Sequence, residues 1–366
     1  MLLRRLHLQN FRNIALARLE LAGPRQFFLG PNGQGKTNFL EAAGLLGALR
    51  SFRGARPGEL VRHGETEARL WCELEHERDG VLEVEIALKP ARREVFIQGA
   101  PCARLADFLG RFPVVALSSQ DLQLLRGLPQ LRRRAMDLLL SSQDETYLNA
   151  LQRYHEALEG RTALLRRTHP PSAAELSAFE AAMATEAVTV CRLRAAATQA
   201  LSAHLRTAYA KLAGAVVEAP DFTYLPETDA TTPEAWRAVW EDGRTKDLAL
   251  HSTRHGPHRD NFSFELDAFG ARAFASEGQQ RGLVVAWRLA QAAWLRERTG
   301  IAPLLLADDV LGELDPARRA GFWRAAADTA QVLATGTLPP LSEGAPWKIW
   351  QVSAGNFTPA AAPNFA

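Results

Sequence analysis

The sequence predicts an α/β protein in which a mixed sheet surrounds a phosphate-binding loop, beside an antiparallel meander and an inserted α-helical domain. Three observations carry this prediction. A glycine-rich loop lies between a short apolar run and a helical pattern, apolar and polar residues alternate through 68–101, and helical periodicity fills 122–214. With 366 residues and 47% hydrophobic content, the chain is long enough to bury the core of one or two domains.

Composition excludes several classes of protein. The net charge is only +2, so a nucleic-acid surface must be local rather than a property of the whole chain. Three widely spaced cysteines, Cys72, Cys102 and Cys191, argue against a disulfide framework and against a zinc site. No apolar stretch approaches 18 residues and no signal-peptide pattern opens the chain. We therefore expect a cytoplasmic protein without a membrane partner.

The N-terminal residues predict three strands. Residues 3–9 alternate apolar and polar side chains and then break at Asn10, Phe11, Arg12 and Asn13, which indicates a strand and a turn. Residues 15–21 alternate again and predict a second strand, antiparallel to the first. Residues 26–29 form a short apolar run that ends at the glycine-rich loop, as expected of a strand that leads into a phosphate-binding loop.

The glycine-rich loop carries the strongest chemical signal. Its residues are Gly30, Pro31, Asn32, Gly33, Gln34, Gly35, Lys36 and Thr37, followed by Asn38. The glycines let backbone N–H groups surround phosphate oxygens, Lys36 reaches the β and γ phosphates, and Thr37 offers a hydroxyl to Mg²⁺. The predicted helix 38–49 points its positive N-terminal end at the triphosphate. The alternative is an ordinary glycine-rich turn.

The next segment predicts a basic loop and a meander. Residues 49–58 contain Arg50, Arg53 and Arg56, which are candidates for contact with a phosphate backbone. The alternative for this loop is a solvated connection. Residues 68–101 predict antiparallel strands with a hairpin turn at Asp79-Gly80.

The middle of the chain predicts helices. An apolar strand at 112–117 ends near Gln120, and apolar residues then recur at helical spacing on both sides of Pro170-Pro171. Two antiparallel arms of nearly forty residues would each reach about 55 Å, and the alternative is a set of shorter helices folded back onto the core. Residues 219–247 predict a weakly structured connection with one short helix. The basic cluster Arg132, Arg133 and Arg134 offers a second candidate contact with DNA.

The last third of the chain supplies two further motifs. Ser276, Gly278 and Gln279 open a helix, and Ser276 with Gln279 has the spacing of a capping box, so a plain helix start is the alternative to a functional role. Residues 303–309 form an apolar strand that ends in Asp308 and Asp309. Parallel strands buried on both faces have this pattern, and their ligands lie at the carboxyl ends. Residues 313–315 read Glu-Leu-Asp, a helix runs to 330, and residues 331–337 predict one more strand.

The order of these motifs resembles the nucleotide-binding head of the ABC and SMC ATPases. About 240 residues separate the phosphate loop from Ser276, many more than expected of a transporter subunit, and the helical insertion is much shorter than an SMC arm. This spacing, together with the motifs at residues 10–13, 121–122 and 256–260, resembles that of the RecF family of bacterial recombination mediators. The similarity extends to about residue 337.

That resemblance implies an ATP-dependent homodimer in which each nucleotide lies between the phosphate loop of one subunit and the Ser276 segment of the other. It implies nucleotide contacts from Arg12, Ser276, Gly278 and Gln279, and a metal shell of Thr37, Asp308 and Gln120. It assigns Lys36 and Asp309 to ATP hydrolysis. Binding to gapped or junction DNA, work with RecO and RecR in loading RecA, and a nucleoid-associated location are also implied. Gly336 stands where the ABC proteins carry a histidine, and Asp309 replaces a glutamate, so hydrolysis should be slow.

We expect an ATPase head in two parts, 1–118 and 248–350, an inserted helical domain at 119–247, and a disordered tail at 351–366. Two other functions stay open. A nucleotide-binding subunit of a membrane transporter would present a partner surface in place of a DNA surface. A scaffold that binds ATP without hydrolysing it would tolerate loss of Asp309.

Overall fold

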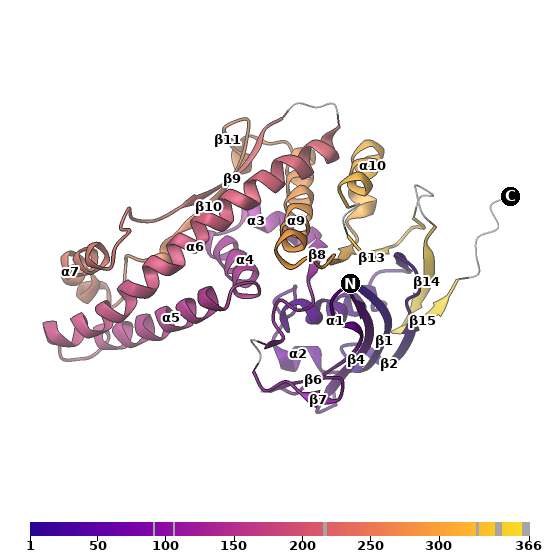
Figure 1. Ribbon diagram of the computed structural model, residues 1–366, viewed down its shortest axis with the longest axis horizontal. Helices are drawn as coiled ribbons and strands as arrows, with labels where there is room; N and C mark the ends of the chain where they lie inside the picture. The colour runs from indigo at the N-terminus through magenta and orange to yellow at the C-terminus, as the bar shows by residue number, and fades with distance from the viewer. Residues whose placement is uncertain (91, 105–106, 215–217, 327–328, 341–345, 361–366) are drawn as a thin grey trace. The chain divides into compact units, whose positions relative to one another are not determined.

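The computed structural model describes residues 1–90, 92–104, 107–214, 218–326, 329–340 and 346–360. The chain divides into two compact units (Figure 1). Unit 1 comprises residues 1–122, 204–219 and 275–366, and unit 2 comprises residues 123–203 and 220–274. The inserted unit thus continues to residue 274, beyond the expected boundary at 247, because a small sheet follows its helices.

Unit 1 contains an antiparallel sheet in the order β2-β1-β4-β5-β6-β7. Its strands are β1 (Leu2–Phe11), β2 (Ile14–Glu20), β4 (Ala68–His76), β5 (Gly80–Leu88), β6 (Arg93–Ile97) and β7 (Ala100–Pro101). The alternating side chains of β1, β4 and β5 place one row of apolar residues in the core. Both the predicted pairing of the first two strands and the predicted meander are confirmed.

The second sheet of unit 1 has the order β15-β14-β3-β13-β12-β8. Its strands are β3 (Arg25–Leu29), β8 (Val114–Ser118), β12 (Leu304–Asp308), β13 (Gln331–Gly336), β14 (Lys348–Ser353) and β15 (Asn356–Pro359). All neighbours run parallel except β14 and β15, which are antiparallel. The carboxyl ends of β3, β12 and β13 therefore lie along one edge of the sheet.

Helix α1 (Lys36–Ala48) contacts β1 of the first sheet and β8, β12 and β13 of the second. A helix between two sheets buries its whole circumference, which explains why α1 is apolar on nearly all sides. Its buried apolar residues are Phe39, Leu40, Ala42, Ala43, Leu45 and Leu46. Unit 1 also holds α2 (Pro57–Leu60), α9 (Glu277–Thr299), α10 (Pro316–Ala325) and the short 3₁₀ helices η2 (Ser119–Asp121) and η4 (Leu311–Glu313).

Unit 2 is built on a helical hairpin. Helix α3 (Leu122–Arg126) leads to α4 (Pro129–Ser141), α5 (Glu145–Leu165) and α6 (Ala173–Ala213), whose last residues belong to unit 1. Helix α6 has 41 residues without a break, or about 60 Å, so the second predicted arm is confirmed. The prediction of one continuous first arm is wrong, because Asp144 accepts a hydrogen bond from the Tyr147 amide and starts a new helix.

The remainder of unit 2 is more ordered than predicted. Strands β9 (Pro220–Leu225), β10 (Asn261–Leu266) and β11 (Phe269–Gly270) form a sheet, accompanied by α7 (Pro233–Leu250), η3 (Pro257–Arg259) and α8 (Ala271–Phe274). The expected weak connection therefore contains a strand and an 18-residue helix. Helix α7 is anchored by Trp236 and Trp240, which stack in a buried cluster with α5 and α6 residues.

The prediction of a disordered tail is wrong for residues 351–359. They form the end of β14 and the whole of β15, and β14 pairs with β3. Residues 361–366 lie outside the described part of the chain. In the part that the structure describes, every helix is too short or too polar to cross a lipid bilayer.

Candidate nucleotide-binding site

The glycine-rich loop joins β3 to α1, as the sequence predicts. Gly33 and Gly35 have backbone φ angles of 78° and 111°, and residues that carry a Cβ rarely adopt such angles. A Cβ at Gly30 would lie 2.3 Å from the Val352 carbonyl oxygen, so this position is closed to any larger residue. The turn therefore depends on its glycines, and its end coincides with the N-terminus of a 13-residue helix.

Lys36 lies inside the loop and is 3% exposed. Its Nζ donates hydrogen bonds to the carbonyl oxygens of Gly30, at 2.6 Å, and Pro31, at 3.0 Å. These two bonds hold an ammonium group against the concave backbone where N–H groups surround a phosphate. Since backbone carbonyls are neutral partners, the positive charge of Lys36 is available to an anion in the loop.

Three side chains, two from the ends of neighbouring strands and one from the first turn of α1, converge at the edge of the sheet. The Asp308 carboxylate, at the end of β12, accepts hydrogen bonds from the hydroxyls of Thr37, at 2.8 Å, and Thr335, at 2.9 Å. Burial raises the pKa of Asp308 above its usual value, while the two hydroxyls oppose this shift and the neighbouring charge of Asp309 adds to it. The predicted pair of Thr37 and Asp308 is thus brought together.

Asp309 has a positive φ of 55°, and its amide N–H donates to the Thr335 hydroxyl at 2.9 Å. Thr335 therefore contacts both acidic residues. The prediction from sequence concerned only the next position, Gly336, where ABC proteins carry a histidine. The Thr335 hydroxyl was not predicted. The available signal was a polar residue at the end of a strand that is otherwise buried.

Arg12 lies beside α1, but its guanidinium is occupied by a protein partner. Its Nε and Nη2 each donate to the buried Glu41 carboxylate at 2.8 Å. Glu41 also accepts a short hydrogen bond from Ser51. Arg53, predicted for DNA, donates from Nη1 to the Asn38 side chain at 3.3 Å and lies 3.7 Å from Glu41. The structure thus places Arg53 next to the first turn of the phosphate-loop helix.

Ser276 caps α9 in the predicted capping box. Its hydroxyl accepts from the Gln279 amide at 3.3 Å, and Gln279 accepts from the Ser276 amide at 2.6 Å. The Gln279 side chain also donates to Glu218 at 2.7 Å. Ser276 is exposed, Gly278 is packed against Arg318, and no hydrogen bond within the described residues joins Ser276 to the phosphate loop. The N-terminus of this 23-residue helix is thus exposed at Ser276, where the helix dipole favours an anion, while the Ser276 and Gln279 amides are bonded within the capping box.

Gln120 is exposed in η2, immediately after β8. Strand β8 is the neighbour of β12, and Ser118 is the register partner of Asp308. The next residue, Asp121, forms an ion pair with Arg288 of α9, with an oxygen to nitrogen distance of 2.5 Å. Gln120 therefore lies on the strand edge that carries Asp308, and its role as a metal ligand stays a prediction.

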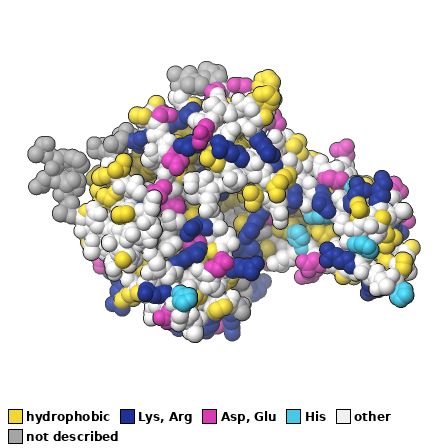
Figure 2. Space-filling model, turned by 180° about the vertical axis from the view of Figure 1, so that it is seen from behind, with side chains coloured by type: hydrophobic (Ala, Val, Ile, Leu, Met, Phe, Trp, Pro, Cys, Tyr) yellow, Lys and Arg dark blue, Asp and Glu magenta, His cyan; other side chains and the backbone are white. Residues whose placement is uncertain are grey.

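The predicted DNA arginines have different surroundings. Arg50, Arg56 and Arg134 are exposed, whereas Arg132 is 9% exposed and donates to the Asn261 side chain and to two backbone carbonyls. The burial of Arg132 and its hydrogen bonds within the chain speak against the predicted contact with DNA. On the face shown in Figure 2, basic side chains lie in several groups, with acidic side chains among them.

The C-terminal hairpin supports the phosphate loop. The backbone carbonyl of Gln34 accepts from the Gly355 amide at 2.8 Å, and its side-chain oxygen accepts from the Ala354 amide at 2.7 Å. On the other side, Asn13 accepts from the Asn38 side chain at 2.8 Å. Turns from both ends of the chain hold the loop. Sequence reasoning missed Gln34 as an anchor because its partners lie about 320 residues away.

Comparison with known proteins gives one consistent result. No family model matches the chain. The chain is 36% identical over 346 residues to a DNA replication and repair protein RecF from Gloeobacter violaceus, with 92% of each chain covered. It is 35% identical over 370 residues to the RecF of Thermosynechococcus vestitus, covering 97% of this chain and 96% of that one. The RecF of Myxococcus xanthus is 33% identical, with 93% and 92% covered.

Solved structures agree with these sequence matches. A structure of the recombination mediator protein RecF with ATP superposes with a TM-score of 0.90 at 26% identity, covering 98% of both chains. An SMC head bound to the C-terminal winged-helix domain of ScpA superposes with a TM-score of 0.55 at 15% identity, covering 98% of this chain and 97% of that one. The predicted ABC and SMC type of ATPase head is thereby confirmed as the fold of this chain.

Proposed function

Because this chain belongs to the RecF family of DNA replication and repair proteins, we propose that it is an ATP-gated DNA-binding protein. In this proposal ATP brings two copies of the chain together, and each site consists of the phosphate loop of one copy and the Ser276 helix of the other. The closed dimer binds gapped or junction DNA in the cytoplasm. With RecO and RecR it promotes loading of RecA, and slow hydrolysis returns it to monomers.

The observation that carries the proposal is the division of nucleotide-binding groups within one chain. Lys36 is directed into the phosphate loop, while the exposed Ser276 at the start of α9 makes no hydrogen bond to that loop within the described residues. A helix N-terminus favours an anion by both its free N–H groups and its dipole. A second copy supplies the anion if ATP is bound at its phosphate loop.

The residues at the strand edge fit Mg²⁺. This ion prefers oxygen ligands and is commonly held by one or two carboxylates together with substrate phosphates. Thr37 and Asp308 supply a hydroxyl and a carboxylate that already lie 2.8 Å apart. Within the described residues there is no cluster of three acidic, histidine or cysteine side chains, so a metal held by protein alone does not fit. Bound Mg²⁺ would neutralise charge that develops on the phosphates.

The protein side chains divide the remaining work. Lys36 would hold the phosphates in place, and Thr335 would fix the orientation of Asp308 and the backbone of Asp309. Asp309 would orient or deprotonate the attacking water. Aspartate is one methylene shorter than glutamate, so we expect slow turnover, which suits a switch.

The test is molecular mass by light scattering in Mg²⁺, with no nucleotide, with ADP and with ATP. The variants are Lys36→Met, which removes the phosphate contact, and Ser276→Asp, which keeps a capping oxygen but repels a γ-phosphate. Ser276→Asn, which caps the helix without charge, is the matched control. We expect wild type to double its mass only with ATP, and both Lys36→Met and Ser276→Asp to remain monomeric.

A second series adds gapped duplex DNA to each sample. The dimer should bind DNA more tightly than the monomer, and binding of an ATP analogue by Ser276→Asp should match wild type. The proposal fails if wild type stays monomeric with ATP bound. It also fails if the mass doubles equally without nucleotide.

A further inference from the structure

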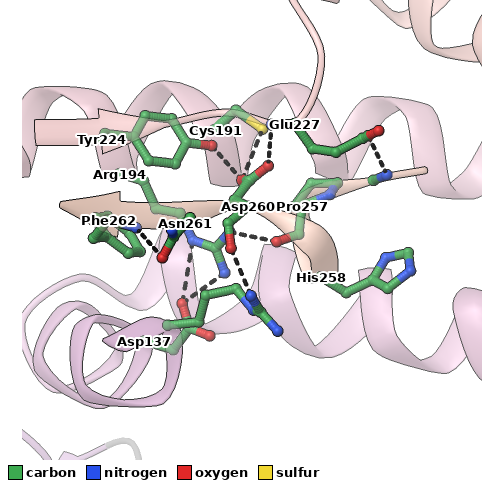
Figure 3. A network of polar contacts seen from close by, with 12 residues as sticks. Asp137, Cys191, Arg194, Tyr224, Glu227, Pro257, His258, Asp260, Asn261 and Phe262 are labelled. Carbon is green, nitrogen blue, oxygen red and sulfur yellow. Dashed lines mark hydrogen bonds and ion pairs between the residues drawn. The ribbon is translucent and has the colours of Figure 1, made fainter. Parts of the chain in front are cut away.

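A buried polar network in unit 2 surrounds the segment Gly256 to Asp260, which the nucleotide site does not use (Figure 3). Arg194 of α6 is 1% exposed and donates to Asp260 at 2.9 Å, to Asp137 at 2.8 Å and to the Pro257 carbonyl at 2.7 Å. Asp260 also accepts from the Tyr224 hydroxyl and, at 3.0 Å, from the Glu227 amide. Contacts from α4, α6 and β9 thus converge on one 3₁₀ turn.

Such a network is a poor way to gain stability alone. Buried ion pairs lose much of their Coulomb attraction to desolvation, and apolar residues of similar volume often stabilise as well or better. The network does fix the conformation of η3, whose Gly256 has a φ of 140° and leaves no room for a Cβ beside the Tyr154 hydroxyl. Its effect is therefore to hold the side chains of this turn in one position.

Two arginines donate hydrogen bonds to backbone carbonyls at or near this turn. Arg133 of α4 is half-buried and donates from Nη1 to the Asp260 carbonyl at 2.6 Å. Arg259 is exposed and donates from Nη2 to the Thr253 carbonyl at 3.3 Å. Both contacts are with neutral backbone oxygens. Neither guanidinium forms an ion pair with any residue that the structure describes.

The neighbouring groups neutralise the charge of Arg133 and Arg259 only in part. The carboxylates that act on Arg133, Asp137 and Asp260, are both bound by Arg194. His258 accepts a hydrogen bond from the Tyr154 hydroxyl at 2.7 Å, and burial lowers the pKa of His258 to about 4, so this ring is uncharged at neutral pH. The guanidiniums of Arg133, Arg194 and Arg259 thus exceed the two carboxylates by one positive charge, and Arg133 and Arg259 both keep unused N–H donors.

We propose that Arg133 and Arg259 bind the phosphate backbone of DNA, at a turn that Arg194 holds through Pro257 and Asp260. This inference rests on the proposed function and adds a DNA contact in unit 2. Guanidinium groups match phosphate oxygens with paired N–H donors and remain charged at all physiological pH values. Their attachment to backbone oxygens lowers the entropy lost on binding. Of the predicted cluster, the proposed site therefore contains Arg133 but not Arg132, and its second arginine is Arg259, which lies far from the cluster in the sequence.

The test compares Arg133→Gln/Arg259→Gln with wild type and with Arg153→Gln. Arg153 is an exposed arginine of the same unit that is paired with Glu186 at 2.9 Å, so it serves as the matched control. Binding of a labelled gapped duplex is followed by fluorescence anisotropy with ATP and Mg²⁺ at several KCl concentrations. Two lost phosphate contacts should lower the slope of log K against log salt by about 1.8, with a loss of affinity of about tenfold. The control should keep the wild-type slope.

A second variant, Arg133→Lys/Arg259→Lys, retains both charges and should keep most of the slope. The proposal is overturned if the glutamine variant binds DNA as wild type does, or if it loses affinity with an unchanged salt slope. It is also overturned if DNA binding is unchanged and only binding of RecR or RecO is lost, since the surface would then serve a protein. If wild type itself binds no DNA with ATP, the proposed function fails first.

Discussion

Replacing Thr335 with valine removes one hydroxyl and leaves the shape of the side chain nearly unchanged. Thr335 is 1% exposed, and its hydroxyl donates to Asp308 and accepts from the Asp309 amide, each at 2.9 Å. The variant deprives Asp308 of one donor and the Asp309 amide of its acceptor. Both changes occur at the strand edge that would hold the metal and the attacking water.

The magnitude follows from these two hydrogen bonds. A hydrogen bond to a charged group contributes about 1.5–3 kcal/mol, and a buried unsatisfied group costs about 1–3 kcal/mol. If the transition state of hydrolysis loses about 1.5–3 kcal/mol of stabilisation, ATP turnover falls by about ten- to a hundredfold. Thr335→Ser retains the hydroxyl and should keep turnover within about threefold of wild type.

The pH profile separates a positioning role from a general loss of stability. Hydrogen bonds to a carboxylate favour its charged form, so the Thr335 hydroxyl lowers a pKa that burial has raised. Its removal must raise the pKa of Asp308 further. Because the ionised form would bind Mg²⁺, the acid limb of phosphate release should move to higher pH in Thr335→Val and remain unmoved in Thr335→Ser.

Phosphate release is measured at saturating ATP, with binding of a fluorescent ATP analogue and thermal unfolding in parallel. The reasoning is refuted if Thr335→Val retains wild-type turnover and its acid limb. A fall in turnover that follows a lower melting temperature, with no movement of the acid limb, would also refute it.

Three further predictions concern other parts of the chain. The variant Asp309→Asn should still form the ATP dimer, because asparagine tolerates the positive φ of this position, but should release phosphate at least about tenfold more slowly. Gln34→Ala removes the acceptor of the Ala354 amide and should weaken binding of a fluorescent ATP analogue severalfold while thermal unfolding changes little. Arg161→Met breaks a buried ion triad with Glu180 and Asp247 and should lower the free energy of urea unfolding by about 3–5 kcal/mol, whereas an exposed Arg237→Gln should have little effect.

The features predicted from sequence are those with a local physical cause. The loop needs its glycines for positive φ and close backbone packing, and a capping box requires only Ser276 and Gln279 at fixed spacing. The apolar strand that ends in Asp308 reflects burial on both faces. In each case the residues that determine the structure lie within one element.

The missed features depend on partners far along the chain. The charges around Arg132 gave no indication that its guanidinium binds Asn261, 129 residues away. The C-terminal strand β14 is held by pairing with β3 and by a hydrogen bond from the Trp350 indole to Gln26, 324 residues away. The Ala- and Pro-rich composition of the tail favours a prediction of disorder. The pairing with β3 was missed because it leaves no pattern in the local sequence.

These distant partners alter how the nucleotide site must be understood. The loop sequence specifies a shape that can bind phosphate, but Gln34 is fixed by the turn between β14 and β15, and Asn38 by the turn between β1 and β2. A loop held from two sides loses less conformational entropy when ATP binds, so part of its affinity arises from residues that never contact ATP. If the C-terminal hairpin contributes in this way, disturbing its turn should weaken nucleotide binding before it weakens the fold. The severalfold effect expected for Gln34→Ala tests that contribution, since the change removes the side-chain anchor to Ala354 and leaves the backbone N–H groups of the loop in place.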